Sequence, residues 1–197
     1  AYGVSVDMTK LFSTLYNRAL EGDADCGGLI SFNYFSGEGV TKFSEGRPLF
    51  VREQNAKMNL ANFMRSNLYA SLATLKIGCD IMLKEEGVKV DSITGHGGLF
   101  KTKGVGQSVL AAALNAPVSV METAGEGGAW GMAVLANFVI QKAAGETLDQ
   151  YLESKVFVGM NKETIAPDPA AVKGFDAYTE SYKKAIEVEK AAIKAVK

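Results

Sequence analysis

The sequence contains few of the residues on which most nucleophilic and metal sites depend. It has one histidine, His96, and two cysteines, Cys26 and Cys79. A single histidine excludes sites built on a pair of histidines, and the glycines beside His96 favour a turn residue over a catalytic one. The two cysteines stand far apart, and neither has a second Cys or His at metal-ligand spacing. We therefore expect two reduced thiols, with neither a disulfide nor a metal site.

The sequence also lacks an excess of charge of one sign, and it lacks long apolar runs. Its 21 Lys and Arg residues balance 22 Asp and Glu residues, for a formal net charge of -1. Such a balance creates no field that would gather nucleic acid or an anionic membrane. No run approaches the roughly 18 apolar residues of a membrane-spanning helix. The opening residues, AYGVSVDMTK, show neither the basic nor the apolar region of a signal peptide. We expect a cytoplasmic protein with no nucleic-acid or membrane partner.

Length and composition indicate one globular domain. A chain of 197 residues that is 47% hydrophobic can bury one sizeable core, with room for a small appendage. The first residue is Ala rather than Met, which suggests processing or a piece cut from a longer protein. We expect the second.

Apolar periodicity predicts helices and strands in alternation. The predicted helices cover 8–20, 61–82, 105–113, 133–140, 148–156 and 175–196, and the predicted strands cover 29–35, 88–93 and 118–121. This order is typical of an α/β layer with parallel neighbouring strands. In the last helix Glu189 and Lys190 interrupt the apolar stripe, so we expect that helix to pack on the outside of the core or against a partner.

Two glycine clusters are the most informative feature of the sequence. One lies at 95–98 and the other at 125–131, and each follows a predicted strand and precedes a predicted helix. Backbone N–H groups at a helix N-terminus, without side chains in the way, can hold a phosphate or lie against a flat base. The dinucleotide fingerprint fails, because Trp130 stands at its third glycine, and a Walker A loop is absent. Tight turns that merely need glycine are the alternative interpretation.

Five short motifs in one order resemble the FGGY family of carbohydrate kinases. They run from about residue 28 to 140: the loop Tyr34–Glu38, the helix segment Phe63–Leu68, the segment His96–Thr102 with Gln107 after it, the pair Pro117–Val118, and the helix segment Glu126–Ala136. The segment His96–Thr102 is similar to the family's Gly-Gly-Gly-x-Lys/Arg-Ser/Asn segment, which holds the adenine end of ATP.

The resemblance implies a fold and a site. The implied fold is α/β, a ribonuclease-H-like domain of the actin-like ATPase superfamily that is incomplete, with extra C-terminal helices. Residues 1–145 would form the nucleotide-binding C-terminal domain, truncated at its N-terminus, and residues 146–197 a helical extension packing on the same domain. The implied ATP-binding residues are Gly97, Gly98, Lys101, Thr102, Gln107 and Glu126. No catalytic residue and no metal ligand is implied within this chain, because the family's catalytic Asp and sugar contacts belong N-terminal to these motifs.

The implied activity is the transfer of phosphate from MgATP to a sugar. The amino-acid sequence is most similar to xylulokinase-like and ribulokinase-like proteins, so we expect a ketose substrate. The resemblance also implies ATP and Mg²⁺ as cofactors and the N-terminal domain of the same kinase as partner. Dimers are common in the family, so a homodimer stays open. The chain departs from the family pattern at Leu99, Gly39 and Tyr69, where the family has Gly, Arg and Glu. The alternative function is a non-catalytic, actin-like regulatory or interaction module.

Overall fold

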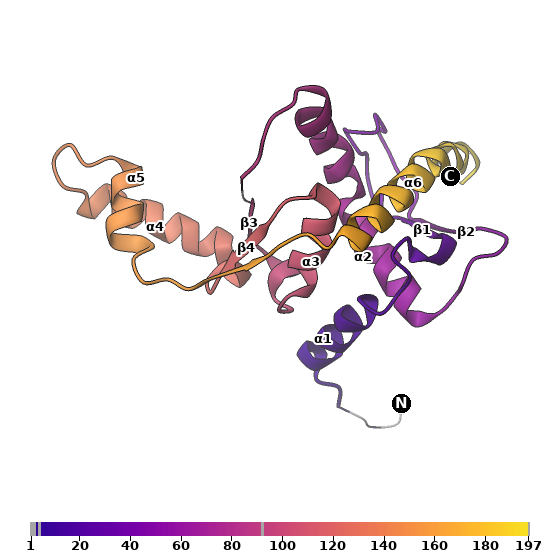
Figure 1. Cartoon of the computed structure of the whole chain (residues 1–197), viewed down its shortest axis with the longest axis horizontal. Coiled ribbons are helices and arrows are strands. Elements are labelled where there is room, and N and C mark those ends of the chain that lie inside the picture. Colours follow the sequence, from indigo (N-terminus) through magenta and orange to yellow (C-terminus); the bar gives the residue numbers. More distant parts are fainter. Residues whose placement is uncertain (1–2, 4, 92, 197) are drawn as a thin grey trace.

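The computed structural model describes residue 3, residues 5–91 and residues 93–196, except for the side chain of Glu126. Figure 1 shows a body of helices around small sheets, from which one helical arm extends. The helices are α1 (Met8–Ala19), α2 (Leu60–Asp80), α3 (Val105–Leu114), α4 (Gly127–Gln141), α5 (Leu148–Tyr151) and α6 (Pro169–Ala195). The short helical turns are η1 (Cys26–Gly28), η2 (Ile81–Glu85), η3 (Gly98–Phe100), η4 (Ala124–Glu126) and η5 (Leu152–Val156). The strands are β1 (Leu29–Phe32), β2 (Leu49–Arg52), β3 (Ile93–Gly95), β4 (Val118–Met121) and β5 (Lys162–Ile165).

The strands form two separate small sheets. In the larger one the order is β3-β4-β5. Strands β3 and β4 are parallel, with Ile93 opposite Val118, and β5 runs antiparallel to β4. The predicted parallel neighbours are therefore confirmed for β3 and β4 alone. Strands β1 and β2 pair antiparallel in the second sheet. Neither β2 nor β5 was predicted: β2 directly follows Pro48, and β5 is the polar tetrapeptide KETI, whose first three residues are exposed.

Helix α2 is the centre of the core. Its first turn is capped by Asn59, whose side-chain oxygen accepts from the backbone N–H of Asn62. Its inner face carries the predicted apolar residues Leu68 and Leu72, which are buried. Arg65 donates from Nη1 to the backbone oxygen of Gly22 over 2.8 Å. This contact fastens the segment after α1 to α2.

Helix α6 belongs to the core, which differs from the expectation that it lies outside. Phe175 and Tyr182 are fully buried and Tyr178 nearly so. The ring of Phe175 stacks on that of Tyr69 with centroids 4.2 Å apart. The interrupted stripe misled the prediction because Glu189 is itself buried, and its Oε1 accepts from the backbone N–H of Arg47 over 2.6 Å. A buried polar group with a hydrogen-bond partner is compatible with a core face.

A buried lysine adds an ionic contact between α2 and α6. Nζ of Lys76 lies 3.1 Å from Asp80 Oδ1 and 3.0 Å from Asp176 Oδ1. The Lys76 side chain is almost completely buried. Two carboxylates offset the cost of taking this ammonium out of water, so the pairing fixes the two helices relative to each other.

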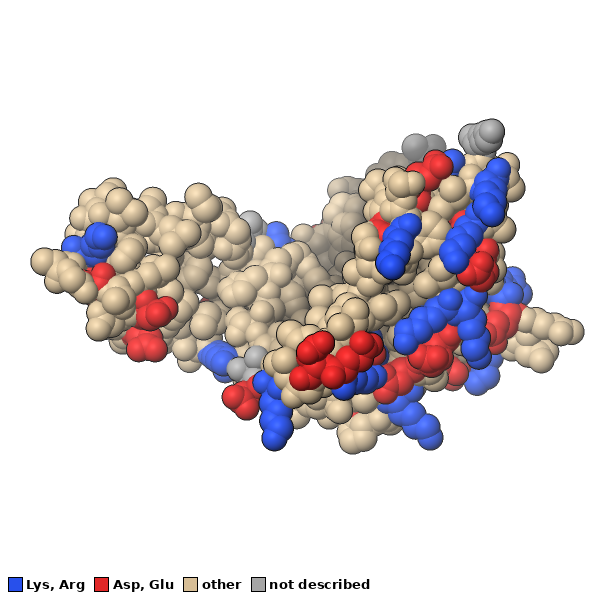
Figure 2. Space-filling view, turned by 90° about the horizontal axis from the view of Figure 1, so that it is seen from above, with Lys and Arg blue, Asp and Glu red and all other residues tan. Residues whose placement is uncertain are grey.

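The arm consists of α4, α5 and η5 and projects from the body (Figure 1). Asn137 donates to the hydroxyl of Tyr151 over 2.6 Å, and the Phe138 ring meets the Tyr151 ring edge-on. None of the described α4 side chains is buried, and Met132 and Val139 are about 70% exposed (69% and 71%). Figure 2 shows that charged side chains gather on the body, whereas the arm presents mostly uncharged surface. Within the described residues, no helix is long and apolar enough to cross a membrane.

The packing of α6 gives a prediction for stability. Tyr178→Ala removes a buried ring that contacts Tyr69 and whose hydroxyl donates to the backbone oxygen of Ser66 over 3.3 Å. We expect it to lower the free energy of unfolding by about 3–5 kcal/mol, the usual cost of deleting a buried aromatic ring. Urea unfolding followed by circular dichroism measures this. The control is Lys184→Ala on the exposed side of α6; equal losses in the two variants would contradict a core role for this helix.

Candidate functional site

The two glycine clusters meet in the structure. The backbone N–H of Gly97 donates to the backbone oxygen of Ala124 over 2.7 Å. A Cβ atom built on Gly127 would lie 2.7 Å from Nδ1 of His96, and one on Gly125 would lie 3.4 Å from Cγ of Lys101. The glycine backbone of the second turn thus packs against the side chains of His96 and Lys101 in the first turn. A larger residue at 127 would push His96 away.

The strand register explains why these turns are neighbours. Gly95 pairs with Val120 in the parallel β3–β4 ladder, so the two strands end side by side. Gly97 and Glu122, two residues further along each strand, follow at the same edge. The carboxyl ends of parallel strands are where open α/β sheets place their ligand crevices.

The main chain is exposed at Gly98 and half-buried at Gly97. Gly97 has φ +108°, which favours glycine, and a Cβ atom on either residue would meet no atom within 4 Å. Gly95 has a different role, because a Cβ there would collide with the ring of Phe100. The ring thereby holds the η3 turn against the end of β3. We call the backbone of Gly97–Gly98 the open backbone ledge.

A cavity of about 380 Å³ lies on the far side of the η3 turn, where Phe100 and Lys101 line it and Gly97 and Gly98 do not. It is lined by Phe100, Lys101, Lys103, Gln107, Val120, Met121, Glu122, Asn161 and Glu163. Two side-chain pairs cross its rim. Nζ of Lys103 lies 3.0 Å from Oε2 of Glu163, and Nδ2 of Asn161 donates to Oε1 of Glu122 over 2.7 Å. The volume lies within the usual range for small-molecule sites, roughly 300–1,000 Å³.

The predicted site residues fall into three places. Gly97 and Gly98 form the ledge, and the exposed Lys101 lies between it and the cavity. Gln107 is buried in the cavity floor, where Nε2 donates to the backbone oxygens of Val118 and Glu163 over 3.2 and 3.1 Å. Gln107 therefore braces α3 against β4 and β5.

The other two predicted residues sit at the ends of the turns. Thr102 is half-buried just before α3, and its backbone oxygen accepts from the N–H of Val105 over 3.3 Å. Glu126 closes η4, and its side chain lies outside the described part of the structure.

The sequence reasoning missed several residues of the cavity. Glu122 directly follows the predicted strand 118–121, so its place at the strand end could have been read from the sequence. Asn161 and Glu163 could not, because they belong to the unpredicted strand β5 and the residues before it. Their contribution depends on long-range pairing, which leaves no local signal in a short polar strand.

The thiols and the lone histidine supply no nucleophile here. Burial raises the pKa of both Cys26 and Cys79, so both stay protonated at neutral pH. His96 is exposed in the turn beside Gly127, in agreement with the turn residue expected. Among the residues that the structure describes, no three His, Cys, Asp or Glu side chains form a group that could hold a metal ion.

Comparisons with known solved structures bear on the fold of this chain. Three similar solved structures are a xylulose kinase from Rhodospirillum rubrum (TM-score 0.64, 21% identity, 90% of this chain and 34% of that one), a gluconate kinase from Lactobacillus acidophilus (0.63, 18%, 92% and 34%) and a glycerol kinase from Plasmodium falciparum with ADP (0.61, 18%, 90% and 33%). These likenesses show the fold, and the chain spans about one third of the length of each. No curated protein sequence matches it significantly.

The sequence also matches a family model over most of its length. Residues 5–140 match the C-terminal domain of the FGGY family of carbohydrate kinases. The match contains every predicted site residue and both glycine turns, and it ends at the last turn of α4. The domain that this model describes has the α/β, ribonuclease-H-like fold of the actin-like ATPase superfamily, as expected. The resemblance seen in the motifs is thereby confirmed, and the chain belongs to the FGGY family of carbohydrate kinases as a C-terminal domain.

Proposed function

We propose that this chain is the ATP-binding domain of a sugar kinase that phosphorylates a ketose such as xylulose or ribulose. The observation that carries the proposal is the open Gly97–Gly98 ledge at the carboxyl edge of the parallel strands. Gly98 is exposed and Gly97 half-buried, and the cavity beyond η3 has Lys101 and Lys103 on its wall, with Lys103 in an ion pair with Glu163. A flat base can lie on bare main chain, and the cations favour the nearby phosphates.

The role of this chain in catalysis is positioning. Phosphoryl transfer asks little covalent chemistry of the protein: the acceptor hydroxyl loses its proton to a base, and the γ-phosphoryl group passes in line to the oxygen. Here Gly97 and Gly98 let the backbone approach the adenosine, Lys101 lies over it, and Thr102 hydrogen-bonds to the base or ribose. Gln107 acts through the cavity floor that it braces.

Glu126 and Mg²⁺ also belong to the proposed ATP-binding site. We assign Glu126 to the nucleotide site from its place at the end of η4, directly beside the ledge turn. Among the residues that the structure describes, no three His, Cys, Asp or Glu side chains are grouped so that they could hold a metal ion. In the kinase Mg²⁺ would arrive with the nucleotide and neutralise charge on its phosphates.

The substrate and the partner belong to the same proposal. The similar structures include xylulose, gluconate and glycerol kinases. The residues of the motifs favour a ketose. The partner is the N-terminal domain of the same kinase, which would bring the sugar contacts and the catalytic base. The chain alone would then be inactive. A cytoplasmic location fits such an enzyme and stays a prediction.

The arm offers a surface for the rest of this kinase. Gly128 and Gly131 have nothing within 4 Å of a built Cβ, and Met132 and Val139 are exposed on the same helix. Bare glycines in a helix allow another element to approach closely, and exposed apolar side chains gain by being covered. The 15 residues of α4 include no charged side chain. The same face favours the alternative function, an actin-like interaction module without catalysis.

Substitution of the ledge tests nucleotide binding. Gly98→Val places a branched side chain in space that is now open, and we expect it to weaken ATP binding at least about 10-fold, or roughly 1.4 kcal/mol. Isothermal titration calorimetry of the chain with ATP measures the change. Gly128→Ala is the matched control, because its Cβ also enters open space but on the arm. Unchanged affinity in Gly98→Val would remove the basis of the proposal.

The substrate assignment predicts the activity of the intact kinase. A coupled assay of ADP release should show turnover with xylulose or ribulose and less with glycerol, and none with this chain alone. Absence of turnover with any ketose or polyol would refute the enzyme assignment.

The arm gives a prediction that distinguishes packing against the rest of the kinase from folding of this chain alone. Met132→Glu together with Val139→Glu should leave the unfolding of this chain nearly unchanged, because both side chains already face water. In the intact kinase the same pair should destabilise by several kcal/mol, because two carboxylates would be buried without partners. Thermal unfolding of both proteins measures this, and equal shifts in the two would show that the arm stays uncovered.

A further inference from the structure

One wall of the cavity is built by residues that lie outside the stretch matching the family. The match ends at residue 140, whereas Asn161 and Glu163 belong to β5 and the residue before it. Each is joined to a residue within the match: Asn161 to Glu122 and Glu163 to Lys103. The C-terminal segment thus shapes a site whose other parts come from the family domain.

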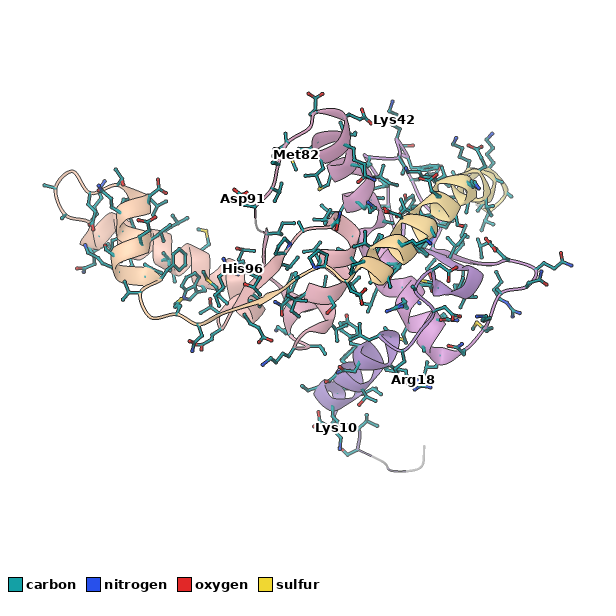
Figure 3. All side chains as sticks on the ribbon, in the orientation of Figure 1. Lys10, Arg18, Lys42, Met82, Asp91 and His96 are labelled. Carbon is teal, nitrogen blue, oxygen red and sulfur yellow. The ribbon has the colours of Figure 1, made fainter. Side chains whose placement is uncertain are left out.

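Glu122 is placed close to the ledge by the strand register. Gly95 opposes Val120 at the end of the parallel pair, and just beyond it the N–H of Gly97 donates to the backbone oxygen of Ala124, two residues after Glu122. His96, labelled in Figure 3, marks this edge of the sheet, with the arm beginning beside it. A base that lies on Gly97–Gly98 therefore has its sugar within reach of Glu122.

The chemistry of this corner suits a ribose. In dinucleotide-binding α/β folds, which are a different fold from this one, a carboxylate accepts a hydrogen bond from a ribose 2′-hydroxyl, and Glu122 offers the same chemical group after β4. At the exposed rim of the cavity, Glu122 Oε1 accepts from Asn161 Nδ2 over 2.7 Å, which favours one orientation of the carboxylate. The second oxygen can then receive a hydroxyl. Phe100 and Met121 supply apolar surface in the same cavity, where the face of a nucleoside can pack.

We propose that Glu122, oriented by Asn161, accepts a hydrogen bond from the ribose 2′-hydroxyl of the bound nucleotide and makes this domain select ribonucleotides over 2′-deoxyribonucleotides. Glu122 is the binding residue, and Asn161 is a positioning residue contributed by the C-terminal segment. The proposal rests on the proposed ATP-binding function and adds that the ribose of the nucleotide is bound by Glu122.

The ratio of the affinities for ATP and 2′-deoxy-ATP tests it. Calorimetry of the chain should give ATP binding about 10-fold tighter than 2′-deoxy-ATP, since a hydrogen bond to a charged group is worth about that much. Glu122→Ala should lower ATP affinity to that of 2′-deoxy-ATP and leave the latter unchanged. Asn161→Ala should reduce the ratio without abolishing it. A purely structural role would move both affinities together and leave the ratio as it is.

A charge-matched control removes an electrostatic explanation. Glu153→Ala, on the exposed turn η5 of the arm, deletes one negative charge far from the cavity and should keep the 10-fold ratio. If both nucleotides bind the unchanged chain equally, the ribose contact is wrong while the ATP-binding function stands. If neither nucleotide binds, the proposed function fails, and this contact fails with it.

Discussion

The contact between the two glycine turns is the constraint on which the site depends. Strands β3 and β4 run parallel and end together, and the N–H of Gly97 donates to the backbone oxygen of Ala124 just beyond those ends. That one hydrogen bond fixes the η3 turn against the η4 turn. Because Gly97 and Gly98 carry no side chains, the fixed turn exposes main chain. A rigid, bare surface at a strand end can bind a flat ligand without first paying to reorganise.

The body behind the ledge is held by parts of the chain that are distant in sequence. The aromatic rings of α6 fill the core against α2, and Lys76 joins the same helices through Asp80 and Asp176. Strand β5, which leads into α6, is braced to α3 by Gln107. Residues after 140 therefore support the domain through two contacts: α6 packs against α2, and β5 is joined to α3. The extension is part of the core and of the cavity wall at once.

The sequence predicted most local elements, and it predicted the long-range ones poorly. The strand expected at 88–93 was misplaced, because only Ile93 of that range lies in β3. The helices α1, α2 and α3 and the strand β4 were found because each has a clear apolar period or a glycine or proline at its end. The two turns at Gly97 and Gly125 were correctly placed after strands and before helices. The buried face of α6 was misjudged, because a buried Glu189 with a backbone partner looks the same in sequence as an exposed one. Strand β5 and the cavity residues Asn161 and Glu163 depend on pairing with β4, which no local pattern reports.

The central claim is that adenosine lies on the Gly97–Gly98 ledge. A titration of the ¹⁵N-labelled chain with ATP, followed by two-dimensional NMR, tests it most directly. The account predicts saturable shifts of the amide signals of Gly97, Gly98 and Lys101, together with Gly125 in the facing turn, while signals of α1 and the arm beyond Phe138 stay in place. Shifts confined to other parts of the chain, with these four amides unmoved at saturation, would contradict it.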